Sequence, residues 1–198
     1  MESNKVVITF IKNPELGKVK TRLASTVGNE QALKIYNSLM THTRKVVESV
    51  AAKRLLFYSQ WINTEDEWSP NFFHKSLQPE GDLGNRMTVA FEAGFENNGP
   101  VIIVGSDCPG LSPEIIEEGF LALEKNDFVI GPALDGGYYL LGMKSYSPSL
   151  FEDIKWSTET VKDETINKIK ALGKSVSELT PLSDIDYEAD WIKYGWEV

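Results

Sequence analysis

The sequence predicts an α/β fold, with a central sheet of mostly parallel strands and helices on both sides. Short apolar runs without polar alternation, such as residues 6–11 and 101–104, have the pattern of strands buried on both faces. Longer segments with apolar residues at helical spacing alternate with these runs, as in βαβ units. The region at residues 135–142 breaks the alternation, so we expect a mixed sheet.

In chain order, strands and helices are expected to alternate along most of the chain. Strands are predicted at residues 6–11, 55–59, 72–77, 101–104, 128–131, 138–142 and 174–179. Helices are predicted at residues 29–52, 113–125 and 157–172, with a further one that follows the Gly-rich loop at residue 78 and ends near residue 96. Ser112 and Pro113 form a capped helix start, and Ser157 is expected to cap the last helix.

Size and composition restrict the class of protein. A chain of 198 residues fits one domain, residues 1–198, and is long enough to bury about 70% of its unfolded surface. The net charge of −9 argues against general binding to nucleic acid or to an anionic membrane. A single cysteine, Cys108, excludes an intrachain disulfide and fits a reducing compartment. With no apolar run long enough for a membrane span and no signal-peptide pattern, we expect a cytoplasmic protein.

A cluster of cations follows the first predicted strand. Lys12, Lys18, Lys20 and Arg22 fall within eleven residues of an otherwise acidic chain, in a loop that contains Gly17. Backbone N–H groups and such side chains can together neutralise a phosphate or diphosphate. The segment is neither a Walker A loop nor a G-x-G-x-x-G loop. Composition alone leaves two interpretations open, a phosphate-binding loop and a solvated surface loop.

Asp107 lies just beyond the apolar run at residues 101–104. In open α/β sheets, ligands bind outside the carboxyl ends of the strands. A carboxylate about 4 Å from a diphosphate would be repelled by roughly 4 kcal/mol at an effective dielectric of 20, and a divalent cation between them reverses the sign. Oxygen ligands with phosphate partners favour Mg²⁺ or Mn²⁺. The alternative is an acid that satisfies only the backbone N–H groups of its own turn.

A second candidate segment is Asp135-Gly136-Gly137-Tyr138. Paired glycines allow close approach of the backbone to a ligand. The Asp-Gly pair is also a strong hairpin signal, so a plain turn between two strands is the alternative. Cys108 has no histidine paired with it and is interpreted as a buried small residue.

Four segments occur together in a fixed order. They are Lys12-x-Pro14-x-x-Gly17-x-x-Lys20-Thr21-Arg22-Leu23, Gly81-Asp-Leu-Gly84-x-Arg86-Met87, Gly105-x-Asp107-x-Pro109 and Gly136-Gly-Tyr138. In this order they resemble GT-A-type nucleotide-diphospho-sugar transferases, in particular a family of small bacterial glycosyltransferases associated with arsenosugar biosynthesis. Phospholactate guanylyltransferases, and more distantly molybdenum-cofactor guanylyltransferases, are related to that family. The resemblance covers nearly the whole chain and implies a three-layer α/β/α, Rossmann-like GT-A fold.

The resemblance also implies roles for individual residues. Lys12, Lys20 and Arg22 would contact the phosphates of the nucleotide. The loop around Gln78, Gly81 and Leu83 would contact its base or ribose. Gly17 and Ser106 are expected on the same nucleotide-binding surface. Asp107 would bind the metal, while Asp135, Gly136, Gly137 and Tyr138 would line the sugar or acceptor pocket. Asp135 would be the base that activates an acceptor hydroxyl. The implied cofactor is Mg²⁺ or Mn²⁺, and the implied partners are a nucleotide sugar or NTP and a small acceptor.

The chain departs from this family in one respect. The second acid of a D-x-D pair is missing, because Gly105 and Pro109 stand two residues either side of Asp107. Asp186 is the expected replacement, since Asp184-Ile-Asp-Tyr-Glu-Ala-Asp190-Trp191 resembles the Asp-Ile-Asp-Thr-Pro-x-Asp-Leu segment of the guanylyltransferases, with Tyr-Glu in place of Thr-Pro. The alternative is that Asp186 caps a helix.

Three functions are compatible with these residues. The first is metal-assisted transfer of a sugar from a nucleotide sugar to a small acceptor. The second is nucleotidyl transfer, in which a phosphorylated acceptor attacks an NTP and pyrophosphate leaves; the chain lacks the L-x-G-G-x-S-x-R-x-G-x-x-K opening of most such enzymes. The third is nucleotide binding without catalysis, since a fold does not fix a function.

Overall fold

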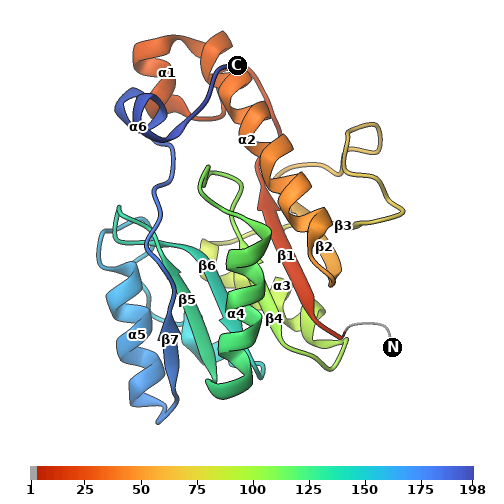
Figure 1. Ribbon diagram of the computed structural model, residues 1–198, viewed down its shortest axis with the longest axis vertical. Coiled ribbons are helices and arrows are strands. Elements are labelled where there is room, and N and C mark those ends of the chain that lie inside the picture. Colours follow the sequence, from red (N-terminus) through yellow and green to blue (C-terminus); the bar gives the residue numbers. More distant parts are fainter. Residues whose placement is uncertain (1–3) are drawn as a thin grey trace.

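The computed structural model describes residues 4–198, and its centre is one seven-stranded mixed sheet (Figure 1). The strands are β1 (Val6–Ile11), β2 (Lys53–Tyr58), β3 (His74–Leu77), β4 (Val101–Val104), β5 (Phe128–Pro132), β6 (Tyr138–Met143) and β7 (Val176–Glu178). They lie in the order β3-β2-β1-β4-β6-β5-β7. β6 runs antiparallel to both of its neighbours, and the other pairs are parallel. The predicted mixed α/β sheet is therefore confirmed.

The middle of the sheet is formed by β1 and β4, which pair in parallel from Val6↔Val101 to Thr9↔Val104. All four residues of β4 are buried, as expected for a strand covered on both faces. Because the two strands run in the same direction, the loops that follow them begin side by side at one edge of the sheet. The cationic loop and the loop that carries Asp107 are thereby brought together.

Helices cover both faces of the sheet and give the expected three layers. On one face α2 (Asn29–Ser49) and α4 (Pro113–Lys125) pack against β1, β2 and β4 through residues such as Val47 and Phe120. On the other face α3 (Leu83–Phe95), the short 3₁₀ helix η1 (Pro148–Phe151) and α5 (Val161–Ala171) pack through residues such as Phe91 and Ile169. Burial of these apolar faces is the main favourable contribution to folding.

Two short helices, α1 (Thr21–Val27) and α6 (Glu188–Tyr194), lie beside each other at the end of the molecule where β1 ends (Figure 1). A small core holds them to α2; its buried residues are Leu23, Ala32, Ile35, Leu39 and Ile185, with Trp191 and Trp196 packed against them. The segment from β7 to α6 therefore passes close to the carboxyl ends of the central strands. Its Ile185 N–H donates to the Asp107 carbonyl at 3.0 Å.

Two helix boundaries differ from the prediction. The helix expected at residues 29–52 is α2, which ends at Ser49. It is preceded by a further helix, α1, and Gly28 with φ of 84° separates the two. Ser157 does not cap a helix: its φ is 64°, and α5 begins at Val161 after Thr160. The reason is tertiary, because the loop at residues 157–159 packs against the turn between β5 and β6. A Cβ added to Gly136 would lie 2.0 Å from the Glu159 carbonyl oxygen.

The segment Asp135-Gly136-Gly137 forms the connection between the antiparallel strands β5 and β6, so the hairpin that the Asp-Gly pair indicated as one alternative is present. None of the helices within residues 4–198 combines the length and apolar character required to cross a bilayer.

Candidate functional site

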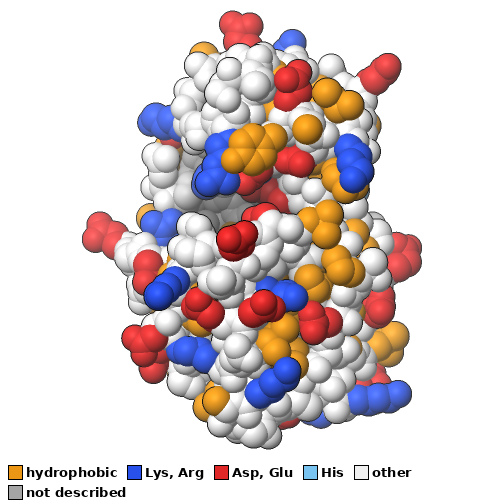
Figure 2. Space-filling view, turned by 90° about the vertical axis from the view of Figure 1, so that its left-hand side faces the viewer, with side chains coloured by type: hydrophobic (Ala, Val, Ile, Leu, Met, Phe, Trp, Pro, Cys, Tyr) orange, Lys and Arg blue, Asp and Glu red, His pale blue; other side chains and the backbone are white. Residues whose placement is uncertain are grey.

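A cleft opens at the carboxyl ends of the central strands, between the end of the molecule formed by α1 and α6 and the end formed by β5, β6 and α5. Figure 2 shows the recess on this face, with acidic side chains in and beside it and basic side chains at its rim. The cleft has a polar part of about 530 Å³ and a less polar part of about 360 Å³. The two parts share Lys12, Tyr36, Leu83, Asp107 and Tyr138 as lining residues.

Most of the residues predicted from the sequence lie around this cleft. The polar part is lined by Lys12, Lys20, Arg22, Leu83, Asp107, Asp135, Gly137, Tyr138 and Asp186, and the less polar part also by Gln78 and Ser106. Gly17, Gly81 and Gly136 are not lining residues; their positive φ angles shape the adjoining loops. Tyr36, Glu159 and Asp184 also line the polar part, and the sequence patterns did not single them out.

Lys20 and two acids form the centre of the polar part. The Lys20 ammonium lies 2.9 Å from Asp107 Oδ2 and 3.5 Å from Asp186 Oδ1. Arg22 Nη1 donates to Asp186 Oδ2 at 2.9 Å. The lysine side chain is only 5% exposed, whereas those of Asp107 and Asp186 are 42% and 38% exposed. Both carboxylates therefore stay accessible from the cleft while one buried cation holds them.

The backbone at Lys20 is held in an uncommon conformation. Lys20 precedes α1 with φ of 47° and ψ of 46°, the left-handed region that non-glycine residues seldom adopt. Buried Val19 and Leu23 anchor the chain on either side. Such strain persists only where surrounding structure enforces it, and it is concentrated at functional sites. Burial by itself lowers the pKa of Lys20, but Asp107 together with Asp186 and Asp184 raises that pKa above its usual value.

Asp184 is a third acid in this cluster. Ile185 points into the core beside α1 and α2, and Asp184 and Asp186 on either side of it both line the cleft. Burial, followed by repulsion from Asp107 and Asp135, raises the pKa of Asp184 to about 7, against a weaker opposing effect of Lys20. The acid–apolar–acid spacing at residues 184–186 is the sequence signal that could have identified it.

The carboxylates of Asp107 and Asp186 are suited to bind a divalent cation that also contacts phosphate. Asp107 and Asp186 face one cationic position, since a single ammonium contacts both of them. Nowhere in residues 4–198 are three or more histidine, cysteine or acidic side chains grouped so that they could hold a metal ion by themselves. Mg²⁺ is commonly bound by one or two carboxylates, with substrate phosphates and waters completing its shell. Asp107 and Asp186 are therefore the residues that would hold such an ion.

The wall of the cleft opposite the cationic loop comes from the β5–β6 turn and from the loop before α5. Asp135 Oδ1 accepts from the Gly137 N–H at 2.9 Å, which fixes this carboxylate at the turn. Trp156, Ser157, Thr158 and Glu159 continue the same wall. Backbone contacts hold the two segments together, including the Lys162 N–H, which donates to the Gly136 carbonyl at 3.0 Å.

The less polar part of the cleft lies between the ends of β1 and β4 and helix α3. Gln78 is buried there, and its amide nitrogen donates to the carbonyls of Ile11 and Phe57 at 3.3 and 3.1 Å. The Tyr36 hydroxyl accepts from the Lys12 N–H and donates to the Lys12 carbonyl, each at 2.9 Å, which fixes the start of the cationic loop. Cys108 is buried, and burial raises the pKa of its thiol to about 12, so it is not poised as a nucleophile.

Comparison with known families identifies the chain at the family level. Residues 42–158, more than half of the chain, match the family described as "Uncharacterized protein conserved in bacteria (DUF2064)". The chain belongs to the DUF2064 family. No curated protein matches the chain.

Solved structures share the fold of this DUF2064 protein. A candidate nucleotide-diphospho-sugar transferase from Desulfovibrio desulfuricans G20 is 31% identical, with a TM-score of 0.86 over 93% of this chain and 83% of that one. The inositol-1-phosphate CTP transferase from T. maritima has a TM-score of 0.61 at 14% identity, covering 96% of this chain and 92% of that one. Rv0371C from Mycobacterium tuberculosis H37Rv, in complex with manganese, has a TM-score of 0.56 at 12% identity, covering 98% of each chain. The fold of this DUF2064 protein is thus that of nucleotide-diphospho-sugar transferases.

Proposed function

We propose that this DUF2064 protein is a glycosyltransferase that moves a sugar from a nucleotide-diphosphate sugar to a small acceptor, assisted by Mg²⁺ or Mn²⁺. The observation that carries the proposal is the convergence of Lys20, Asp107 and Asp186 at one point of the cleft, opposite Asp135. The 31% identical structure described as a candidate nucleotide-diphospho-sugar transferase supports the same reaction class. The more specific part of this proposal is that the protein acts like the arsenosugar glycosyltransferases that its sequence resembles.

The residues divide the reaction between two walls of the cleft. On one wall Lys12, Lys20 and Arg22 bind the diphosphate and stabilise the negative charge that develops on the leaving nucleoside diphosphate. On the other wall Asp135 accepts the proton of the acceptor hydroxyl, whose oxygen forms a bond to the sugar carbon while the bond from that carbon to the diphosphate breaks. A bound divalent cation would add charge neutralisation at the diphosphate. The less polar part of the cleft, beside Gln78, Gly81 and Leu83, would take the base and ribose.

Nucleotidyl transfer is the second candidate. It is favoured by the number of cations on the loop, since Lys18 joins Lys12, Lys20 and Arg22 around the polar part and four cations suit a triphosphate. In that reaction a phosphorylated acceptor attacks the α-phosphate and pyrophosphate leaves. The same residues would bind the nucleotide, but the products differ.

One experiment separates the candidates. The protein is incubated with a panel of nucleotide sugars, and separately with GTP or CTP and phosphorylated acceptors, in the presence of Mn²⁺. Release of a nucleoside diphosphate supports glycosyl transfer, and release of pyrophosphate supports nucleotidyl transfer. Binding of nucleotides without either product would favour a nucleotide-binding protein. Absence of both binding and product would refute the proposal.

The cellular setting is part of the proposal. A single buried cysteine suits a reducing compartment, and we propose that the reaction takes place in the cytoplasm. We further propose that residues 1–198 act as one domain, because the strap formed by residues 182–187 ties the α1–α6 end to the sheet. Within this strap the Leu182 N–H donates to the Pro132 carbonyl at 3.0 Å, and the Leu182 carbonyl accepts from the Leu134 N–H at 2.9 Å.

A further inference from the structure

We propose that the acceptor is an uncharged polyhydroxy compound rather than a phosphorylated one; this inference rests on the proposed glycosyl transfer. It follows from how charge is divided between the two walls of the cleft. All lysine and arginine residues that line the polar part come from the cationic loop, namely Lys12, Lys18, Lys20 and Arg22. The wall formed by the β5–β6 turn and the loop before α5 contributes Asp135 and Glu159.

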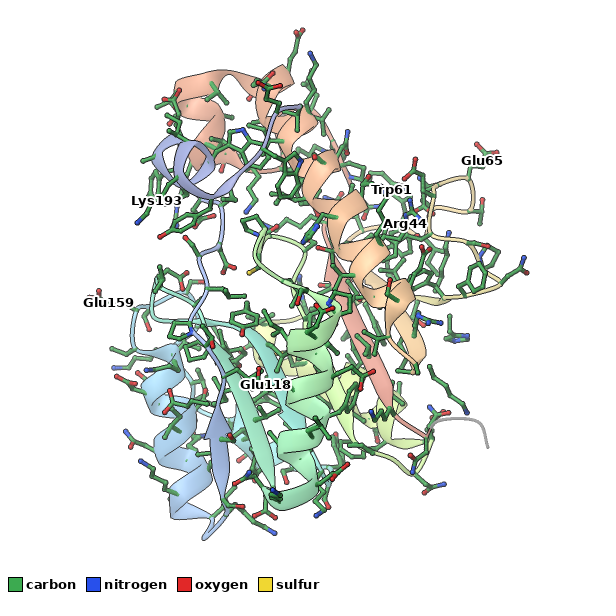
Figure 3. All side chains as sticks on the ribbon, viewed as in Figure 1. Arg44, Trp61, Glu65, Glu118, Glu159 and Lys193 are labelled. Atoms are coloured by element: carbon green, nitrogen blue, oxygen red, sulfur yellow. The ribbon has the colours of Figure 1, made fainter. Side chains whose placement is uncertain are left out.

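Three of the cations around the cleft have other partners. Arg86 lines the less polar part but donates to the Gly81 carbonyl at 3.2 Å. Lys162 follows this wall in sequence, and its ammonium lies 3.2 Å from Asp163 and 3.8 Å from Glu178. Lys193 lies on α6 (Figure 3), with its ammonium over the Tyr194 ring at 4.8 Å from the centroid. Neither lysine is a lining residue of the cleft as described over residues 4–198. This wall therefore presents Asp135 and the exposed Glu159 to the cleft and none of its lining residues is a cation, so the negative charge of a phosphate on the acceptor would be repelled there.

The same wall suits hydroxyl groups. Ionised carboxylates only accept hydrogen bonds, so Asp135 and Glu159 require an acceptor that brings O–H donors. The Ser157 hydroxyl can donate as well as accept, whereas the Thr158 hydroxyl already donates to the Lys155 carbonyl at 2.8 Å. Trp156 adds an aromatic surface to this wall. Ser157 is held at φ of 64°, a strained conformation for serine that keeps this segment against the turn at Gly136. The wall is therefore held in place by its contacts with the β5–β6 turn.

The test compares matched acceptor pairs with the full chain and a nucleotide sugar that it binds. Binding of the donor is first measured by thermal shift with Mn²⁺, so that failure of the proposed function is recognised separately. Release of nucleoside diphosphate is then measured with glucose against glucose 6-phosphate, and with glycerol against glycerol 3-phosphate. We expect the neutral member of a pair to raise the release at least tenfold more than its phosphorylated counterpart. Preference for the phosphorylated member, or no response to any neutral compound, would overturn the inference although the donor binds.

A charge-reversal variant tests the physical cause. Glu159→Lys should lower the preference for the neutral acceptor about tenfold or more, because it places a cation on the acceptor wall. Glu118→Lys makes the same change of net charge on α4, at a residue that is not a lining residue of the cleft, and should leave the preference unchanged (Figure 3). Equal effects of the two substitutions, or none from Glu159→Lys, would show that the wall does not select by charge. If no nucleotide sugar binds to either protein, the proposed function fails and this inference fails with it.

Discussion

The Lys20 ammonium lies 2.9 Å from Asp107 Oδ2, and this ion pair joins the loop after β1 to the loop after β4. The ammonium also lies 3.5 Å from Asp186, so one buried cation holds acids from two distant segments. Two acids that face one cation are also the arrangement that would bind a divalent ion. Lys20 and a metal ion would therefore stabilise the same carboxylates.

Replacement of Lys20 should make the protein less stable without metal and more responsive to it. Lys20→Met leaves Asp107, Asp184 and Asp186 without their shared cation, and we expect a loss of about 1–2 kcal/mol, since the partial exposure of the acids reduces the usual cost of breaking a buried pair. Addition of Mn²⁺ should raise the melting temperature of Lys20→Met more than that of the wild type. Lys18→Met is the control, because Lys18 is 60% exposed and pairs with Glu15. An equal response to Mn²⁺ in all three proteins would contradict the prediction.

Removal of either acid should weaken metal-dependent nucleotide binding. Asp107→Asn and Asp186→Asn keep the size of the side chain but remove a charged oxygen ligand, so we expect the dissociation constant for a nucleoside diphosphate with Mn²⁺ to rise at least tenfold, measured by calorimetry. Binding without Mn²⁺ should change much less. Asp163→Asn provides the control, since Asp163 is exposed and contacts Lys162. If Asp107→Asn bound the nucleotide as the wild type does with Mn²⁺, the metal assignment would be wrong.

Asp184 should make the metal-free protein less stable as the pH rises. Its pKa is about 7 in the folded protein, against an ordinary value of 3.8. Between these values the folded state binds more protons than the unfolded state, so the stability that protonation provides is complete below about pH 3.8 and is lost as the pH rises through about 7. In EDTA, the melting temperature of the wild type should therefore fall, relative to that of Asp184→Asn, as the pH is raised from 5 to about 8. Parallel curves for the two proteins would show that Asp184 does not titrate in this range.

A side chain at Gly136 should destabilise the protein. Gly136 has φ of 91°, and an added Cβ would lie 2.0 Å from the Glu159 carbonyl oxygen. Gly173 also has a positive φ, 68°, but a Cβ there would meet nothing within 4 Å. Gly173→Ala should cost about 1 kcal/mol from backbone strain alone, whereas Gly136→Ala should cost clearly more, because the loop at residues 157–159 must shift. Chemical unfolding of both variants measures the difference, and equal losses would mean that this contact is easily relieved.

Short buried strands and the residues that follow them could be predicted from local patterns. The apolar runs at residues 6–11 and 101–104 identify β1 and β4, because a strand covered on both faces requires continuous apolar residues. The Asp-Gly pair at residue 135 predicts the β5–β6 hairpin for an equally local reason. Asp107 could be placed at the end of β4 in the same way.

Long-range packing set the details that local patterns do not contain. Serine is a residue type that often caps helices, but contact of this loop with the Gly136 turn holds Ser157 at positive φ, and α5 begins only at Val161. Asp186 was compatible with a helix cap, yet Asp190 is the acid whose carboxylate accepts from the N–H groups of Asp186 and Tyr187 at the start of α6. Asp186 is left to face Lys20 and Arg22.

The sequence by itself determined the fold class, the cationic loop and the strand-end acid, because each depends on neighbouring residues and on the period of hydrophobicity. Only the tertiary structure decided which distant acids meet. Ile185 is buried beside α1 and α2, and this burial places Asp184 and Asp186 next to Asp107 and Lys20. The segment at residues 184–186 could be singled out from the sequence, but its position beside Lys20 depends on how the chain returns after β7.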